Sequence, residues 1–165
     1  MVNILRIFRH LMATRSQVRR AFPEKALLSI EAAISEMEAT HDGQIRFAVE
    51  HALDIGPLLR GQNAHERAIE VFSMLKVWDT EHNNGVLIYL LWADRGVEIV
   101  ADRGIHARFG ASGWENICRE MEACFREGRF EAGIEGGIHA VGSVLQLHFP
   151  AMAGPDELSN KPVLF

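Results

Sequence analysis

The chain has 165 residues, the usual size of a single domain, and 48% of them are hydrophobic against 24% charged. These ordinary values exclude a chain that is disordered throughout. The net charge of −5 excludes the broad basic surface of a typical nucleic-acid-binding protein, so no nucleic-acid partner is expected. No apolar run approaches the roughly 18 residues of a membrane-spanning helix. The two cysteines are expected to be free thiols, which favours a reducing, cytoplasmic location.

Residues 1–22 are predicted to form a basic amphipathic helical segment of their own. Residues 1–23 contain five arginines and no acidic residue. Arg6 and Arg9 interrupt any apolar run that a secretory signal would need. Two alternatives remain: the segment docks on the domain or on a second copy, giving a homodimer, or it makes a peripheral contact with an anionic membrane. The apolar residues at helical spacing in it are Ile4, Leu5, Phe8, Leu11 and Met12.

The main domain is predicted over residues 23–150 and begins with alternating helix and strand patterns. A helix follows Pro23, and its apolar residues recur on one face. Residues 44–50 alternate with a period of two, which predicts a strand with one covered face. Asn63 is predicted to cap the second helix.

The second half of this domain opens with an apolar run over residues 86–92. The run does not alternate, which predicts a central strand buried on both faces. A turn leads back into a strand over residues 97–100 as a tight hairpin. Two helices finish the domain before Pro150, and residues 151–165 are predicted to be a loose tail. The order helix, strand, helix, strand, strand, helix, helix predicts an α/β fold, a three-layer α/β/α sandwich with a small mixed sheet.

Polar side chains gather in the loop that precedes the central strand. Loops rich in oxygen ligands bind hard cations, so this loop predicts a Ca²⁺ or Mg²⁺ site, and no organic cofactor is expected. The spacing does not fit an EF-hand, because its sixth position would be Asn84 and its twelfth Leu90. The alternative is a solvated turn with unusual backbone angles. The predicted metal ligands are Asp79, Glu81, Asn83, Asn84 and Asp102.

A second polar segment follows the returning strand and contains Asp102, Arg103 and His106. If both strand ends open on the same side, these residues face the first loop across a shallow groove. Clefts at strand ends commonly hold ligands. The alternatives are a turn at Asp102, a capping or surface position for His106, and solvation for Arg103.

The Asn83-Asn84-Gly85 entry to the central strand, the hairpin and the run over residues 97–106 together resemble a TPM domain, over roughly residues 25–150. The chain is similar to a small bacterial-type member without a membrane anchor. The resemblance implies an α/β/α sandwich with a shallow acidic groove at the strand ends. It also implies metal-dependent acid phosphatase activity, calcium binding, or help in the assembly or repair of membrane complexes. Asn83 and His106 stand where the family has acids, which weakens binding of a hard cation.

We therefore expect a binding or accessory module whose groove holds an unidentified protein partner or a structural ion. The alternative is a divalent-metal-dependent phosphatase acting on phosphate monoesters. In it a cation on Asp79, Asn84 and Asp102 activates water. Arg103 binds the phosphate and His106 protonates the leaving group. A third alternative gives the function to the N-terminal helix, as a membrane-surface or dimer contact.

Overall fold

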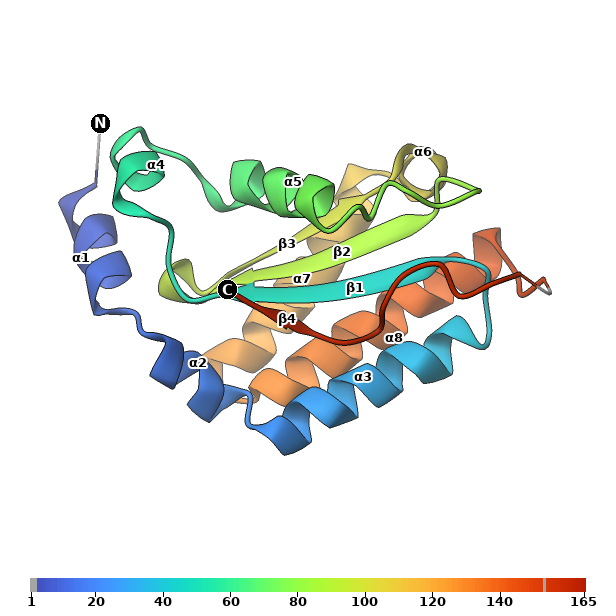
Figure 1. Ribbon diagram of the computed structural model, residues 1–165, viewed down its shortest axis with the longest axis horizontal. Helices are drawn as coiled ribbons and strands as arrows, with labels where there is room; N and C mark the ends of the chain where they lie inside the picture. Colours follow the sequence, from blue (N-terminus) through green and yellow to red (C-terminus); the bar gives the residue numbers. More distant parts are fainter. Residues whose placement is uncertain (1–2, 153) are drawn as a thin grey trace.

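The computed structural model describes residues 3–152 and 154–165, and they form a mixed sheet with helices on both faces (Figure 1). The sheet has four strands in the order β3-β2-β1-β4. Strand β1 runs parallel to β2 and to β4, and β3 runs antiparallel to β2. This arrangement confirms the predicted α/β sandwich with a small mixed sheet. The strands are β1 (Gln44–Glu50), β2 (Gly85–Leu91), β3 (Gly96–Ala101) and β4 (Val163–Leu164).

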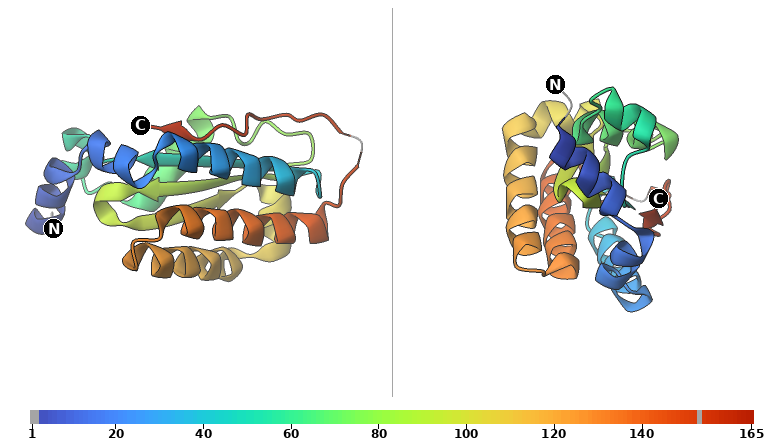
Figure 2. Two further views of the ribbon diagram at one scale, coloured as in Figure 1. Left: turned by 90° about the horizontal axis from the view of Figure 1, so that it is seen from below. Right: turned by 90° about the vertical axis from the view of Figure 1, so that its left-hand side faces the viewer.

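Three long helices cover one face of the sheet: α3 (Glu24–Glu38), α7 (Ala111–Arg126) and α8 (Phe130–His148). In Figure 1, α3 and α8 lie below the sheet and α7 passes behind it, and Figure 2 shows the three helices side by side. Side chains from alternate positions of the strands pack against them, among them Phe47 and Ile88, which are fully buried. Burial of this apolar surface is the main stabilising contribution of the larger core.

The opposite face is covered by α4 (Ile55–Leu59) and α5 (Ala64–Met74). Asn63 caps α5 with its side chain, as predicted, and accepts a hydrogen bond from the N–H of Glu66 at 2.8 Å. Leu87 and Leu91 of β2 pack on this side. Strand β2 is therefore buried on both faces, which explains its unbroken apolar run.

Strand β1 is also buried along its whole length, although its alternation predicted one open face. Its polar side chains have partners that lie far away in the sequence. Gln44 Oε1 accepts hydrogen bonds from the N–H groups of Glu157 and Leu158 at 3.1 and 2.9 Å. Arg46 donates to the carbonyl of Ser159. The prediction of an open face was wrong because the C-terminal segment covers this strand.

That C-terminal segment adds β4 next to β1, an element that the sequence did not predict. Val163 and Leu164 pair with Ala48 and Val49. The N–H of Phe165 donates to the carbonyl of Val49 at 2.9 Å, which continues the pairing. A strand of two residues has no periodicity to detect, so the sequence predicted a loose tail. One residue of that tail, 153, lies outside the described residues.

The N-terminal segment forms two helices, α1 (Ile4–Met12) and α2 (Arg15–Ala21), where the sequence predicted one helical segment. Thr14 separates them. Its hydroxyl accepts a hydrogen bond from the N–H of Gln17, and the side chain of Gln17 accepts one from the N–H of Thr14. This capping box begins a new helix. Residues 1 and 2 of the predicted segment lie outside the described part of the chain.

The hairpin between β2 and β3 is closed by a short 3₁₀ helix, η1 (Trp92–Asp94), and by Arg95 in the left-handed conformation with φ of 55°. After β3, Asp102 caps α6 (Arg103–Phe109). Helices η1 and α6 are too short to show a reliable hydrophobic period. Within the described residues, no helix combines the length and the apolar character needed to cross a bilayer.

Candidate functional site

The loop before β2 packs directly against the start of α6. A Cβ atom placed on Gly104 would lie 2.6 Å from the carbonyl oxygen of Asn83 and 2.8 Å from that of His82, so the two backbones touch. The N–H of Asp102 donates to the carbonyl of Gly85 at 2.9 Å and extends the pairing of β2 with β3. The structure brings the two predicted segments together as direct neighbours.

Asn83 and Arg103 connect these segments on their outer side. Asn83 has a left-handed backbone with φ of 51°, the unusual angle expected of an Asn-Asn-Gly turn. The Nε of Arg103 donates to Oδ1 of Asn83 at 3.4 Å. A single long hydrogen bond holds this exposed guanidinium loosely, so it stays accessible to an anionic group.

Asn84 is fully buried and ties the loop to the turn before β1. Its Nδ2 donates to the carbonyl of Asp42 at 3.0 Å, and its N–H donates to Oγ1 of Thr80 at 3.2 Å. Its Oδ1 has no hydrogen-bond partner among the described residues. A buried acceptor without a partner is costly, so this oxygen is an unsatisfied polar group inside the loop.

The acidic residues of the predicted metal site have separate positions. Asp102 caps α6: Oδ1 accepts from the N–H of Arg103 at 2.7 Å, and Oδ2 is buried without a partner in the described part of the chain. Asp79 and Glu81 are exposed. Across residues 3–152 and 154–165, no group of three or more His, Cys, Asp or Glu side chains could hold a metal ion. The side-chain amides of Asn83 and Asn84 are not among such groups, so the predicted metal site stays a prediction.

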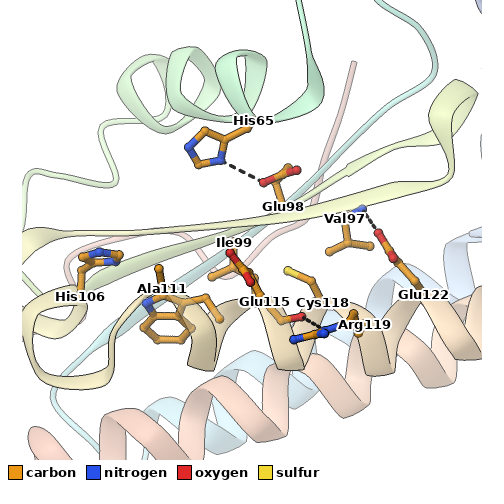
Figure 3. A pocket seen from close by; sticks show the side chains of 11 residues that line it. His65, Val97, Glu98, Ile99, His106, Ala111, Glu115, Cys118, Arg119 and Glu122 are labelled. Atoms are coloured by element: carbon orange, nitrogen blue, oxygen red, sulfur yellow. Dashed lines mark hydrogen bonds and ion pairs between the residues drawn. The ribbon is translucent and has the colours of Figure 1, made fainter. Parts of the chain in front are cut away.

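His106 lies in a different place from the loop, in a pocket of about 380 Å³ between β3, α5 and α7 (Figure 3). In this pocket Nδ1 of His65 lies 2.9 Å from the carboxylate of Glu98. His106 is exposed at one end, beside Ala111. The structure thus places Asp102 and Arg103 next to the predicted loop, whereas the side chain of His106 lines the pocket beside β3.

A polar groove that the sequence did not predict lies at the same end of the sheet. It has a volume of about 330 Å³ and runs between the C-terminal end of α3, the turn before β1 and the tail. We call it the strand-end groove, and it is a different groove from the one predicted between the loop before β2 and residues 102–106. Asp42 connects it to the loop before β2, because its Oδ2 lies 3.0 Å from Nδ1 of His82 and its carbonyl accepts from Asn84.

Glu38, at the end of α3, has one carboxylate oxygen in use and one available in this groove. Oε1 accepts a hydrogen bond from the N–H of Ile45 at 2.8 Å. Oε2 is buried and has no partner within residues 3–152 and 154–165. Burial raises the pKa of Glu38 to about 7 and Asp156 adds to the rise, whereas the bond from Ile45, the side chain of Asn160 and the charge of Arg46 oppose it. The carboxyl group therefore changes charge close to neutral pH.

His41 presents a donor to the same groove. It is only 3% exposed, and its Nδ1 accepts a hydrogen bond from the N–H of Gly43 at 3.1 Å. Burial lowers the pKa of His41 to about 4, so the ring is neutral at pH 7 and carries its proton on Nε2. Nε2 has no partner in the described chain, and neither has Oδ1 of Asn160 on the tail side.

Residues 20–144 match a family model described as the TPM domain. The chain belongs to the TPM domain family. Among solved structures, the BA42 protein from the psychrophilic bacterium Bizionia argentinensis is 30% identical, with a TM-score of 0.75 over 86% of this chain and 93% of that one. The N-terminal domain of a P. gingivalis protein has a TM-score of 0.62 at 17% identity over 78% and 81%, a likeness of fold alone. No curated protein matches the chain.

The TPM match contains the three longer strands and the helices that flank them. It ends at residue 144 and therefore stops before the tail that forms one wall of the strand-end groove. It begins at residue 20, after α1. Family membership thus accounts for the scaffold, while the groove wall and the N-terminal helix have to be explained from this chain's own residues.

Proposed function

We propose that this TPM-domain chain is an accessory binding module whose strand-end groove holds an organic ammonium group. The proposal rests on three residues that line one groove and that each have a buried polar atom without a hydrogen-bond partner in the described residues. These atoms are Oε2 of Glu38, Nε2 of His41 and Oδ1 of Asn160. Each such atom costs about 1–3 kcal/mol when it stays unsatisfied. A ligand that pairs with all three recovers that free energy.

The charges of the groove favour a cation. Its wall contains the carboxyl groups of Glu38, Asp42 and Asp156, and no lysine or arginine is among the described residues that line it, while Arg46 acts on Glu38 from outside the lining. The two available acceptors, on Glu38 and Asn160, suit the N–H donors of an ammonium group. Binding of the cation also favours the ionised form of Glu38, which burial otherwise disfavours.

His41 distinguishes an organic cation from a metal ion. Because Nδ1 accepts from the N–H of Gly43, the neutral ring has its proton on Nε2. A protonated nitrogen cannot ligate a metal, but it donates a hydrogen bond to an oxygen. The ligand is therefore expected to carry an acceptor oxygen as well as its ammonium group: an amino alcohol carries it two carbons away, and a lysine residue of a partner protein carries it in its backbone carbonyl.

The proposal is tested by titrating the ¹⁵N-labelled full chain with four probes and following its amide resonances. Ethanolamine and Nα-acetyl-lysine methylamide carry both groups, ethylene glycol lacks the charge, and Ca²⁺ lacks the N–H donors. We expect saturable shifts at His41, Asp42 and Asn160 with the amines, and none with ethylene glycol. Saturation by the lysine derivative alone would assign the ammonium group to a partner protein.

The matched variants are Glu38→Gln and Glu36→Gln, since Glu36 is exposed on the same helix. Glu38→Gln should weaken amine binding at least tenfold, and Glu36→Gln should leave it unchanged. Saturation by Ca²⁺ without any response to the amines would overturn the proposal and restore the metal site. Equal amine affinity in both variants would also overturn it.

A divalent-metal-dependent phosphatase is the second candidate. It is supported by the unpaired, buried oxygens of Asn84 and Asp102, in segments joined by the hydrogen bond from Asp102 to Gly85. The accessible guanidinium of Arg103 suits a phosphate. Hydrolysis of p-nitrophenyl phosphate is measured with Mg²⁺, Mn²⁺ and Ca²⁺ in turn. A rate that Asp102→Ala leaves unchanged rules out this site.

A further inference from the structure

Helix α1 presents its apolar face to solvent, the reverse of a helix that packs on a core. Figures 1 and 2 place it at one end of the molecule, next to η1. Five of its six large apolar side chains are between 58% and 80% exposed, and the sixth, Ile7, packs against the smaller core. Such a contiguous apolar strip on an otherwise polar surface marks an interaction site. The strip consists of Ile4, Leu5, Phe8, Leu11 and Met12.

Polar contacts fix this orientation. Nε and Nη2 of Arg6 donate to the carboxylate of Asp94 at 3.0 and 2.8 Å, and Nη1 donates to the carbonyl of Gln62 at 2.8 Å. Nε2 of His10 lies 3.2 Å from the same carboxylate, and its Nδ1 accepts from the N–H of Leu53 at 3.0 Å. The basic face of α1 is the docked face, so the apolar strip stays outside without unfolding or rotation.

The surroundings of the strip are positively charged. Arg9 is exposed at its border, and α2 adds the exposed side chains of Arg15, Arg19 and Arg20. No acidic residue occurs before Glu24. Basic residues beside an apolar strip complement the anionic headgroups and the acyl boundary of a lipid bilayer.

We propose that α1 anchors the chain at the surface of an anionic membrane, with the strip of Ile4, Leu5, Phe8, Leu11 and Met12 inserted at the headgroup–acyl boundary and the domain held above it by the Arg6–Asp94 pair. A second copy is the competing occupant. A two-fold contact through α1 brings each arginine-rich segment against its own copy, which is repulsive. A helix of nine residues is also only about 13 Å long, and its strip is small beside the roughly 1,200–2,000 Å² of a stable interface.

The test is co-sedimentation of the full chain with vesicles of phosphatidylcholine alone or of phosphatidylcholine and phosphatidylglycerol in equal parts. We expect binding to the anionic vesicles, at least tenfold less to the neutral ones, and a marked loss in 1 M salt. The double variant Phe8→Ser/Leu11→Ser should lower anionic binding at least tenfold. The control Leu147→Ser, equally apolar and exposed on α8, should bind as the wild type does.

Phe8, Leu11 and Leu147 are all exposed, and thermal unfolding is measured to check that each variant keeps the fold. A second variant, Arg15→Gln/Arg19→Gln, leaves the strip intact and should weaken binding to anionic vesicles only. Unaltered binding of the Phe8→Ser/Leu11→Ser variant overturns the proposal. It is equally overturned if the wild type ignores vesicles and sediments as a dimer that this variant dissociates, which assigns the strip to a second copy.

Discussion

The guanidinium of Arg6 and the carboxylate of Asp94 approach to 2.8 Å, and this pair decides which face of α1 meets the domain. Asp94 also lies within 3.4 Å of Nη2 of Arg9 and 3.2 Å of Nε2 of His10. Burial alone would raise the pKa of Asp94, but the contacts with Arg6 and His10 hold it below its usual value. One carboxylate therefore orients a helix that buries little apolar surface of its own.

Removal of this carboxylate should release α1. We expect Asp94→Asn to lower the free energy of unfolding by about 1–3 kcal/mol, because the guanidinium of Arg6 loses its charged partner and Nε2 of His10 loses the carboxylate beside it. Amide hydrogen exchange in residues 4–12 should rise most. Asp54→Asn is the control, since Asp54 is exposed and its side chain makes no capping bond. Protection of α1 that survives Asp94→Asn would show that other contacts orient the helix.

Glu38 and His41 should give the stability opposite dependences on pH. The pKa of Glu38 is about 7 in the folded chain and about 4.5 as a reference, so the folded state binds the extra proton and stability falls as pH rises through this window. The pKa of His41 is about 4 against 6.5, so the unfolded state binds the extra proton and stability rises with pH. The charged groups that act on them are Asp156 and Arg46 at Glu38, and Asp42 at His41; hydrogen bonds from Ile45 and Asn160 act on Glu38, and one from Gly43 acts on His41.

Single variants separate these two slopes. Between pH 4.5 and 6.5, Glu38→Gln should make the unfolding free energy rise more steeply with pH than in the wild type. With His41→Gln, the unfolding free energy should fall as the pH rises over the same range. Urea unfolding at several pH values measures both. Parallel curves for the two variants would show that these groups do not titrate differently in the folded and unfolded states.

The fold was largely predictable because its central strand and long helices carry strong periodicity. Strand β2 is a continuous apolar run that both layers cover, and the helical faces of α3, α7 and α8 repeat over several turns. The burial of Arg46 was not predictable, because its partner Ser159 lies more than a hundred residues away. Local pattern identifies elements, whereas contacts of long sequence separation decide which polar residues are buried.

In the candidate site too, local patterns identified segments, whereas contacts of long sequence separation were missed. The Asn-Asn-Gly entry and the residues after β3 identified two segments that do touch, through Gly104 and the carbonyls of His82 and Asn83. The strand-end groove was missed because its two walls are Glu38 to Gln44 and the tail, which no spacing rule connects. His41 and Asp42 follow closely on a helix in the sequence, and nothing local signals that Asn160 completes the groove.

The contact of Gly104 with the preceding loop predicts a strong effect of one methyl group. A Cβ at this position meets two backbone carbonyl oxygens within 2.8 Å, and backbone cannot move aside as a flexible side chain does. We expect Gly104→Ala to destabilise the chain by about 1–3 kcal/mol. Gly136→Ala on α8 is the matched control, because its Cβ meets nothing within 4 Å. It should stabilise by up to about 1 kcal/mol. Equal unfolding midpoints for the two variants would contradict the packing of the loop on α6.

Glu50 is a buried charged residue beside the smaller core, and Arg67 and Tyr89 donate hydrogen bonds to its carboxylate. Nε and Nη2 of Arg67 donate to its two oxygens at 2.9 and 3.0 Å, and the hydroxyl of Tyr89 donates at 2.6 Å. The hydrogen bond to Glu50 raises the pKa of Arg67, and burial raises the pKa of Tyr89. Removal of one partner leaves a buried charge uncompensated, which costs about 3–5 kcal/mol.

We therefore expect Arg67→Met to lower the unfolding free energy by about 3–5 kcal/mol at pH 7. The double variant Glu50→Gln/Arg67→Met should recover part of the loss at pH 7, since it leaves no buried charge. Arg126→Met is the control, as Arg126 is 75% exposed and 4.0 Å from Glu122, and should change stability by less than about 0.5 kcal/mol. Urea unfolding measures all three, and a loss for Glu50→Gln/Arg67→Met as large as that for Arg67→Met would show that packing, not charge, is what Arg67 contributes.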